Sequence, residues 1–256
     1  MPWLGKRVLI IGLGEVGQPL SEIVRGVYPQ TEIYDVKMGE RELPKNIDVM
    51  HICYPYNADF IGESVKYALN VKPKLLLIES TVPPGTTTAI SALIMNKGML
   101  VAHSPVNGRI ADGMKFCLYN YTKFIGPTSR EAGEMAEEYY QSLGFKTKVF
   151  SGPWETEFAK LIDLAYFAVM LGWNQEMRRI AKKYDLNFDE IVEFLQDVTV
   201  RSGYRFPRPV YDGKPIGGHC IIPALETLNS IYLSKFLEAV LESNKEASKC
   251  IVEEKA

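Results

Sequence analysis

The stretch KRVLIIGLGEVG, residues Lys6–Gly17, decides the fold of this 256-residue chain. Its apolar run, Lys6–Ile11, ends in glycines, as expected of a buried parallel strand. The glycines that follow have the spacing GxGxxG and open a segment of helical periodicity, Glu15–Gly26. In such a unit the glycines permit a tight turn, close approach of a pyrophosphate, and packing of the helix on the strand. We therefore predict a Rossmann-type dinucleotide-binding domain, whose cofactor contacts include Gly12, Gly14, Glu15, Val16 and Gly17.

An acidic residue follows the second predicted strand, Glu32–Val36. Asp35 lies near the end of this strand, about twenty residues after the glycines, where a carboxylate accepts hydrogen bonds from ribose hydroxyls. The same carboxylate repels the 2′-phosphate of NADP, so we expect NAD as the cofactor. Lys37 is expected to soften that preference. The alternative is a glycine turn with an aspartate that takes no part in binding.

Strand and helix signals alternate through the rest of the first half. Apolar runs predict further strands at Ile47–Cys53, Lys74–Ser80, Met99–His103, Phe116–Ile125 and Lys146–Phe150. Helical spacing predicts helices over Thr86–Asn96 and Ser129–Leu143. This order is typical of the α/β class, with a doubly wound parallel sheet and helices on both of its faces.

The pattern changes near residue 151. Trp154–Lys183 has helical spacing throughout, and Phe188–Val200 predicts a second helix. Arg201–Gly218 is rich in Pro, Gly and Arg and is expected to be a loop, before a further helix over Pro223–Asn244. We expect an NAD-binding domain over residues 1–151 and an all-helical substrate and dimerisation domain over residues 152–256.

Composition excludes several classes of protein. A net charge of −2 provides no footprint for nucleic acid or an anionic membrane. No apolar run approaches the roughly 18 residues that span a bilayer, and the N-terminus has no signal-peptide pattern. The four cysteines are scattered without CxxC spacing, which argues against a disulfide framework or a zinc site: Cys53, Cys117, Cys220 and Cys250. We expect a cytoplasmic protein without a metal.

Three further segments point to a family. Glu79–Thr87 (ESTVPPGTT) follows a strand, Glu157–Lys160 (EFAK) opens the long helix, and Gly217–Ile221 (GGHCI) ends the loop. Together with Gly12–Leu20 (GLGEVGQPL), these strings resemble the UDP-glucose/GDP-mannose dehydrogenase family over nearly the whole chain. That family oxidises the C6 alcohol of a nucleotide sugar to a carboxylate in two NAD-dependent steps. A cysteine thiolate holds the aldehyde-level carbon between the steps.

The resemblance implies roles for three matching residues. Cys220 would be the nucleophile, Lys160 the catalytic lysine, and Thr81 the family's threonine beside the cofactor. A thiolate can add to an aldehyde, and the thiohemiacetal can then lose hydride to the nicotinamide. An ammonium group close by would stabilise the oxyanion or relay a proton. The alternatives are a packing cysteine after two glycines and a solvated helix lysine.

The chain departs from the family pattern at residues linked to hydrolysis. The asparagine four residues after the lysine is Leu164 here, with Asp163 as a partial substitute, and the aspartate four residues after the cysteine is Ala224. The glutamate at the fifth-strand end has no clear equivalent. The resemblance also implies a C-terminal nucleotide-binding domain that we expect this chain to lack. Phosphate contacts would then come from a partner chain or from an arginine-bearing loop, Arg201, Arg205 and Arg208, or would be unneeded because the substrate is smaller. These departures leave the second half of the reaction open.

Other candidates surround the predicted nicotinamide pocket. His103 ends a strand and is either a proton carrier or a buried histidine hydrogen-bonded to the backbone. Tyr54 and Pro55 follow the third strand and are expected to shape the cofactor pocket. His219 neighbours Cys220 and is expected to lower the pKa of that thiol.

The interpretation we favour is an NAD-dependent oxidoreductase acting on a sugar or nucleotide sugar. The alternatives are a hydroxyacid dehydrogenase or reductase, and a non-catalytic NAD-binding protein. The long helix predicts a homodimer, because apolar residues surround its middle: Leu161, Leu164, Ala165, Phe167, Ala168, Val169, Met170, Leu171 and Trp173. The alternative is a monomer in which Pro223–Asn244 folds back across this helix.

Overall fold

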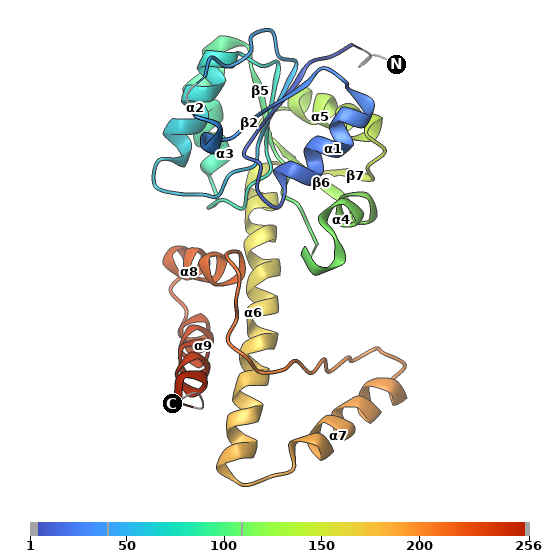
Figure 1. Cartoon of the computed structure of the whole chain (residues 1–256), viewed down its shortest axis with the longest axis vertical. Helices are drawn as coiled ribbons and strands as arrows, with labels where there is room; N and C mark the ends of the chain where they lie inside the picture. Colours follow the sequence, from blue (N-terminus) through green and yellow to red (C-terminus); the bar gives the residue numbers. More distant parts are fainter. Residues whose placement is uncertain (1–4, 40, 109, 254–256) are drawn as a thin grey trace. The chain divides into compact units, whose positions relative to one another are not determined.

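The computed structural model describes residues 5–39, 41–108 and 110–253. The chain divides into two compact units, residues 1–160 and 161–256. The first unit carries the sheet, and the second is helical (Figure 1). The predicted boundary at residue 151 lies just before helix α6 (Pro153–Lys183), whose first two turns belong to the first unit.

The described part of the first unit contains a seven-stranded sheet in the order β2-β1-β3-β4-β5-β6-β7. Strands β2, β1, β3, β4 and β5 run parallel to one another. All four residues of β1, β3 and β4 are buried, because helices cover both faces of a parallel sheet. The predicted α/β class is confirmed. The strands are β1 Val8–Ile11, β2 Thr31–Tyr34, β3 Val49–Ile52, β4 Leu75–Ile78, β5 Leu100–His103, β6 Lys123–Pro127 and β7 Thr147–Val149.

Helices lie on both sides of the sheet (Figure 1). Val8 and Ile10 pack in one cluster with residues of α1 and α5, whereas Leu9 and Ile11 pack in another with residues of α2 and α3. This alternation follows from the period of two along a strand. The helices of the first unit are α1 Gly17–Val27, α2 Phe60–Val71, α3 Thr86–Ile94, α4 Met114–Asn120 and α5 Arg130–Ser142, with short 3-10 turns η1 Val36–Met38, η2 Met95–Lys97 and η3 Ile110–Asp112.

The sheet is not parallel throughout, and one predicted strand is wrong. The segment predicted as a strand, Phe116–Ile125, begins as helix α4, and β6 follows at Lys123–Pro127. Strand β6 runs antiparallel to β5, and β7 runs parallel to β6. Helix α4 contacts α1 instead of crossing the sheet. Because no helix carries the chain back across the sheet after β5, β6 begins near the end of β5 and runs in the opposite direction.

The second unit consists of the rest of α6 with three helices, α7 Phe188–Arg201, α8 Ile221–Ile231 and α9 Lys235–Glu253, in its described residues. The single helix predicted over Pro223–Asn244 is wrong. Asn229 accepts the backbone N–H of Ser234, and the Ser234 hydroxyl accepts that of Leu237, so the chain ends α8 and caps α9. Within the described chain, no helix has the length and apolarity that a membrane span requires.

Candidate functional site

The loop between β1 and α1 has the geometry of a phosphate cradle. Gly12 has φ of 91°, and a Cβ there would lie 2.8 Å from the backbone nitrogen of Tyr54. A Cβ on Gly17 would lie 1.8 Å from the carbonyl oxygen of Gly12, whereas a Cβ on Gly14 would meet nothing within 4 Å. No side chain caps α1 at Val16. Gly14 therefore faces open space at a helix N-terminus, and the residues present fit a pyrophosphate.

Asp35 is held against this loop. One carboxylate oxygen accepts the N–H of Leu13 at 2.8 Å, and the other accepts the N–H of Lys37 at 3.0 Å. The Leu13 and Lys37 amides lower the pKa of Asp35. Each oxygen keeps a second lone pair, so the ionised side chain can also accept ribose hydroxyls.

The carboxyl ends of β3 and β4 meet beside the same loop. Ser80 Oγ donates to the carbonyl of Tyr54 at 2.6 Å and thereby ties the two ends together. The Tyr54 hydroxyl lies 2.7 Å from Ser64 Oγ, and burial raises the pKa of Tyr54, so the phenol stays protonated. Next to this hydrogen bond in the sequence, Thr81 is partly exposed and Pro55 is exposed. Tyr54, Pro55 and Thr81 thus lie at one edge of the sheet.

Lys160 lies in the second turn of α6 and is partly buried. Its Nζ is 3.5 Å from Oδ1 of Asn107, in the loop after β5. The sequence had assigned no role to Asn107. The structure places its amide beside the predicted catalytic lysine.

His103 is completely buried at the end of β5. Its Nε2 lies 3.1 Å from the Ser80 carbonyl, and its Nδ1 lies 2.8 Å from Thr156 Oγ1. Because a carbonyl only accepts, Nε2 carries the proton and Nδ1 accepts from the hydroxyl. Burial lowers the pKa of His103 to about 3, so the ring is neutral at pH 7. Of the two readings of this residue, the geometry favours the buried, hydrogen-bonded histidine.

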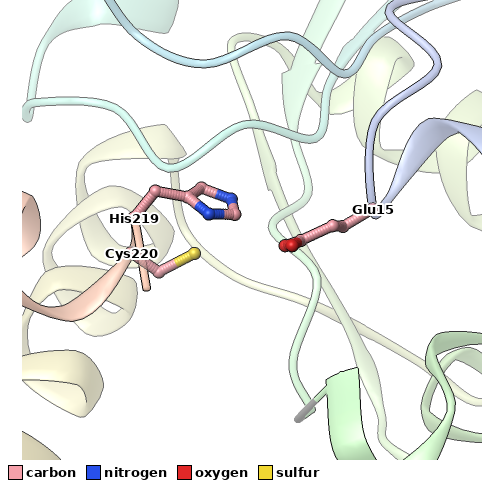
Figure 2. Close-up of side chains that lie close together, drawn as sticks. All are labelled: Glu15, His219 and Cys220. Carbon is pink, nitrogen blue, oxygen red and sulfur yellow. The ribbon is translucent and has the colours of Figure 1, made fainter. Parts of the chain in front are cut away.

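Cys220 is exposed at the N-terminus of α8, in the second unit. The preceding Gly218 has φ of 79°, a conformation that favours glycine, and Cys220 O accepts the N–H of Ala224 at 3.1 Å. Figure 2 shows the His219 ring and the Cys220 thiol projecting from this segment; the Glu15 that it also labels belongs to the glycine loop of the first unit. The N-terminal amides and dipole of a helix favour an anion such as a thiolate.

Sequence comparison relates the chain to known enzymes, although no family model matches it. The UDP-N-acetyl-D-mannosamine dehydrogenase of Pyrococcus horikoshii is 32% identical over 231 residues, which cover 82% of this chain and 52% of that protein. The enzyme of the same name from Methanocaldococcus jannaschii is 25% identical over 268 residues, covering 85% of this chain and 60% of that protein. UDP-glucose 6-dehydrogenases are also among the similar proteins.

The chain is similar in sequence to UDP-N-acetyl-D-mannosamine dehydrogenases and to UDP-glucose 6-dehydrogenases. The resemblance predicted from its motifs is confirmed. The chain spans 52% and 60% of the length of these two archaeal relatives. The solved UDP-D-ManNAc dehydrogenase of Pyrococcus horikoshii has a TM-score of 0.80 at 20% identity, covering 94% of this chain and 68% of that one. A 3-hydroxyisobutyrate dehydrogenase from Mycobacterium tuberculosis has a TM-score of 0.70 at 16% identity, covering 96% of this chain and 94% of that one. Both structures share the fold.

Two departures from the dehydrogenase family pattern have a clear structural setting. Ala224 is buried one turn after Cys220 on α8, so a packed methyl group occupies the position of the family's aspartate. Leu164 follows Lys160 by one turn of α6 and is partly buried, while Asp163 beside it is exposed. Neither Ala224 nor Leu164 can polarise a water molecule.

A buried polar cluster, not predicted from the sequence, lies behind the edge that carries Thr81. Glu79 Oε1 lies 2.8 Å from His51 Nδ1 and accepts from the Tyr140 hydroxyl at 2.7 Å, while Lys123 donates to Oε2. Lys123 also donates to the Ser104 carbonyl at 2.5 Å. Burial alone would raise the pKa of Glu79, but the Lys123 charge and His51 lower it to about 2. The only sequence signal was a charged residue within each of two apolar runs, Lys74–Ser80 and Phe116–Ile125.

Proposed function

We propose that this chain is an NAD-dependent oxidoreductase that oxidises the primary alcohol of a nucleotide sugar. The observation that carries the proposal is the exposed Cys220 at the start of α8, directly after Gly217, Gly218 and His219. Relatives named UDP-N-acetyl-D-mannosamine dehydrogenase and UDP-glucose 6-dehydrogenase support this substrate class. The glycine loop and Asp35 support the cofactor.

NAD would be held at two places in the first unit. The amides at the start of α1 and the open side of Gly14 would take the pyrophosphate, and Asp35 would take the adenosine ribose. Tyr54 and Thr81 would line the nicotinamide end. When bound, NAD supplies the acceptor for the hydride that leaves the alcohol carbon.

Cys220 would hold the carbon at the aldehyde level. Its thiolate adds to the carbonyl carbon, the C–S bond forms, and the oxygen takes up a proton to give a thiohemiacetal. The Lys160 ammonium would stabilise the developing oxyanion and deliver that proton. Thr81 would orient the sugar hydroxyl.

Loss of a hydride from the thiohemiacetal to a second NAD, with loss of the hydroxyl proton, would leave a thioester on Cys220, and hydrolysis of this thioester would be slow. It needs a water that a polar group polarises, and α8 offers the methyl of Ala224 at the corresponding position. We therefore expect oxidation to outpace release of the acid. An acyl group should then accumulate on Cys220, and Cys220→Ser should abolish the adduct.

The experiment is a measurement of NADH production with UDP-N-acetyl-D-mannosamine, UDP-glucose and 3-hydroxyisobutyrate. We expect a burst of NADH with one nucleotide sugar, followed by slow turnover, and, by intact mass spectrometry, the acyl adduct formed from that sugar on Cys220. Turnover of the hydroxyacid instead would favour the alternative enzyme, whose solved relative matches nearly the whole chain. Thermal stabilisation by NAD without turnover of any compound would favour a non-catalytic NAD-binding protein.

A further inference from the structure

The first turns of α6 contact the segment after β4 at three points, all within the first unit. The carboxylate of Glu157 accepts the backbone N–H of Gly85 at 2.6 Å and that of Thr87 at 2.8 Å. The Trp154 ring packs on Gly85, where an added Cβ would come within 3.3 Å of the indole. These contacts join segments about 70 residues apart in the sequence.

A second bridge runs from the same helical turn to the beginning of that segment. Thr156 Oγ1 lies 2.8 Å from His103 Nδ1, and His103 Nε2 donates to the Ser80 carbonyl at 3.1 Å. Thr156 and His103 are both buried. Residues 80–87 are thus attached to α6 near both ends.

Glu157 replaces a cap that α3 lacks. Helix α3 begins after Gly85, which has no side chain to accept the first amides. Glu157 is fully buried and supplies both acceptors from another element. Burial raises the pKa of Glu157, and the amide hydrogen bonds from Thr87 and Gly85 offset part of that rise. A buried carboxyl costs free energy unless hydrogen bonds compensate for its desolvation, and here the two amides of the segment do so.

The two attached elements carry two of the predicted functional residues. Thr81 lies inside the segment that Ser80 and Gly85 delimit, and Lys160 lies one turn of α6 after Glu157. Any shift of the segment on the helix would change the separation of Thr81 and Lys160. Misplacement of a reacting group by about 1 Å can slow a reaction by roughly a hundredfold.

We propose that Glu157, assisted by the Thr156–His103 bridge, is a positioning residue that holds Thr81 in register with Lys160 and the cofactor. The role rests on the proposed function. It requires no contact between Glu157 and substrate. In this proposal the buried His103 links Thr156 to the Ser80 carbonyl and transfers no proton.

The test compares Glu157→Gln, which loses the two-oxygen acceptor, with Glu155→Gln, the same change at an exposed position of the same turn. Hydrogen exchange of the amides at 85 and 87 should accelerate at least roughly tenfold in Glu157→Gln. The rate of the NADH burst, which reports hydride transfer before thioester hydrolysis, should fall roughly tenfold to a hundredfold at saturating sugar, and NAD should bind more weakly by calorimetry. Glu155→Gln should match wild type throughout.

The outcomes separate this role from a purely structural one. Faster exchange with an unchanged NADH burst rate and unchanged NAD affinity would overturn it, and so would unchanged exchange. Glu157→Asp keeps the charge and should recover part of the burst rate. If Glu157→Gln fails to fold, the same measurements are made on Glu157→Asp. Wild-type NAD binding without turnover would overturn the proposed function alone, and exchange and NAD affinity would still decide the role of Glu157. A wild-type chain that binds no NAD overturns both.

Discussion

The imidazole Nδ1 of His51 lies 2.8 Å from Oε1 of Glu79, and neither side chain has any exposed surface. Four elements meet at this contact, β3, the end of β4, β6 and α5, because Lys123 reaches Glu79 from β6 and the hydroxyl of Tyr139, on α5, lies 2.8 Å from His51 Nε2. The cluster joins the ends of β3, β4 and β6 behind the candidate site. Its charges are paired, so loss of one partner leaves the other buried alone.

Lys123→Met should therefore destabilise the protein by about 3–5 kcal/mol. The double variant Glu79→Gln with Lys123→Met should cost less than the sum of the single changes, because it removes both charges together. Urea unfolding of the four proteins measures this coupling. Lys148→Met, at an exposed position of β7, is the control and should have little effect. If the losses of unfolding free energy in the two single variants add up to that of the double variant, Glu79 and Lys123 are not coupled as a charge pair.

The buried His103 predicts a pH dependence of stability. Its pKa in the folded protein is lowered to about 3 from 6.5, so the unfolded state takes up the proton first. The free energy of unfolding should fall as the pH drops below 6.5, by about 2 kcal/mol at pH 5. The pKa of Glu79 is lowered from 4.5 to about 2, so its contribution is present above pH 4.5 and is lost only below it.

Urea unfolding between pH 7.5 and pH 5, compared between wild type and a variant without the imidazole, measures the contribution of His103. His103→Gln should flatten the profile in this window while leaving the loss below pH 4.5 in place. A His103→Gln profile that parallels wild type would exclude His103 as its source.

Local sequence patterns predicted the elements whose burial is regular along the chain. Val8–Ile11 and Leu75–Ile78 are apolar at every position and were read correctly as strands. The end of helix Met114–Asn120 was wrongly predicted as part of a strand, because the β-branched and aromatic residues that follow it, Tyr121 to Ile125, continue the same apolar run. Helix α2 was missed although Phe60, Ser64, Ala68 and Val71 are buried at helical spacing.

The site was predictable only where its residues are adjacent in sequence. The glycine loop and Asp35 follow a local motif, and the structure brings them together through the Leu13 amide. Glu157 contacts Gly85, and Lys123 contacts Glu79, only because strands and helices meet in space. No spacing rule links such residues, so their partners come from the fold.

Asp35→Ala should narrow the preference for NAD over NADP. Hydrogen bonds to a charged group contribute about 1.5–3 kcal/mol, so the affinity for NAD should fall by roughly tenfold or more. NADP should bind more tightly than to the wild type, because the carboxylate that repels its 2′-phosphate is gone. Asp35→Asn keeps an acceptor for the Leu13 amide and separates loss of charge from disorder of the loop. Lys37→Ala should widen the preference. Calorimetric titration with both cofactors measures each change, and tighter NADP binding by the wild type would contradict the assignment.

Cys220 should be the most reactive thiol of a Cys250→Ser background. It is exposed at a helix start, whereas Cys117 is buried, and burial raises the pKa of Cys53. Peptide mapping after brief iodoacetamide treatment should find Cys220 modified first, and bound NAD should change the rate at which Cys220 is alkylated. His219→Ala should slow the reaction if the imidazole favours the thiolate. Earlier labelling of Cys53 or Cys117, with activity surviving Cys220→Ser, would refute the covalent mechanism.

The chain should form a homodimer through one face of α6. Helices α8 and α9 do fold back on this helix, where Val240 packs on Gly172 and Leu225 and Leu237 share a core with Ala165 and Ala168. They leave another face uncovered, on which four apolar side chains at helical spacing are each at least 40% exposed: Ile162, Tyr166, Trp173 and Ile180.

An exposed apolar stripe of this length on a long helix is typical of a surface that a second copy covers. Light scattering at micromolar concentration should find about twice the 28.9 kDa of one chain. Trp173→Glu, on this stripe, should produce a folded monomer or unfold the protein, because the charge would be buried without a partner. Lys183→Glu also introduces a negative charge on an exposed side chain of α6, but outside the stripe, and should leave the dimer intact. A mass that stays at that of one chain on concentration would refute the dimer and would leave this stripe facing solvent.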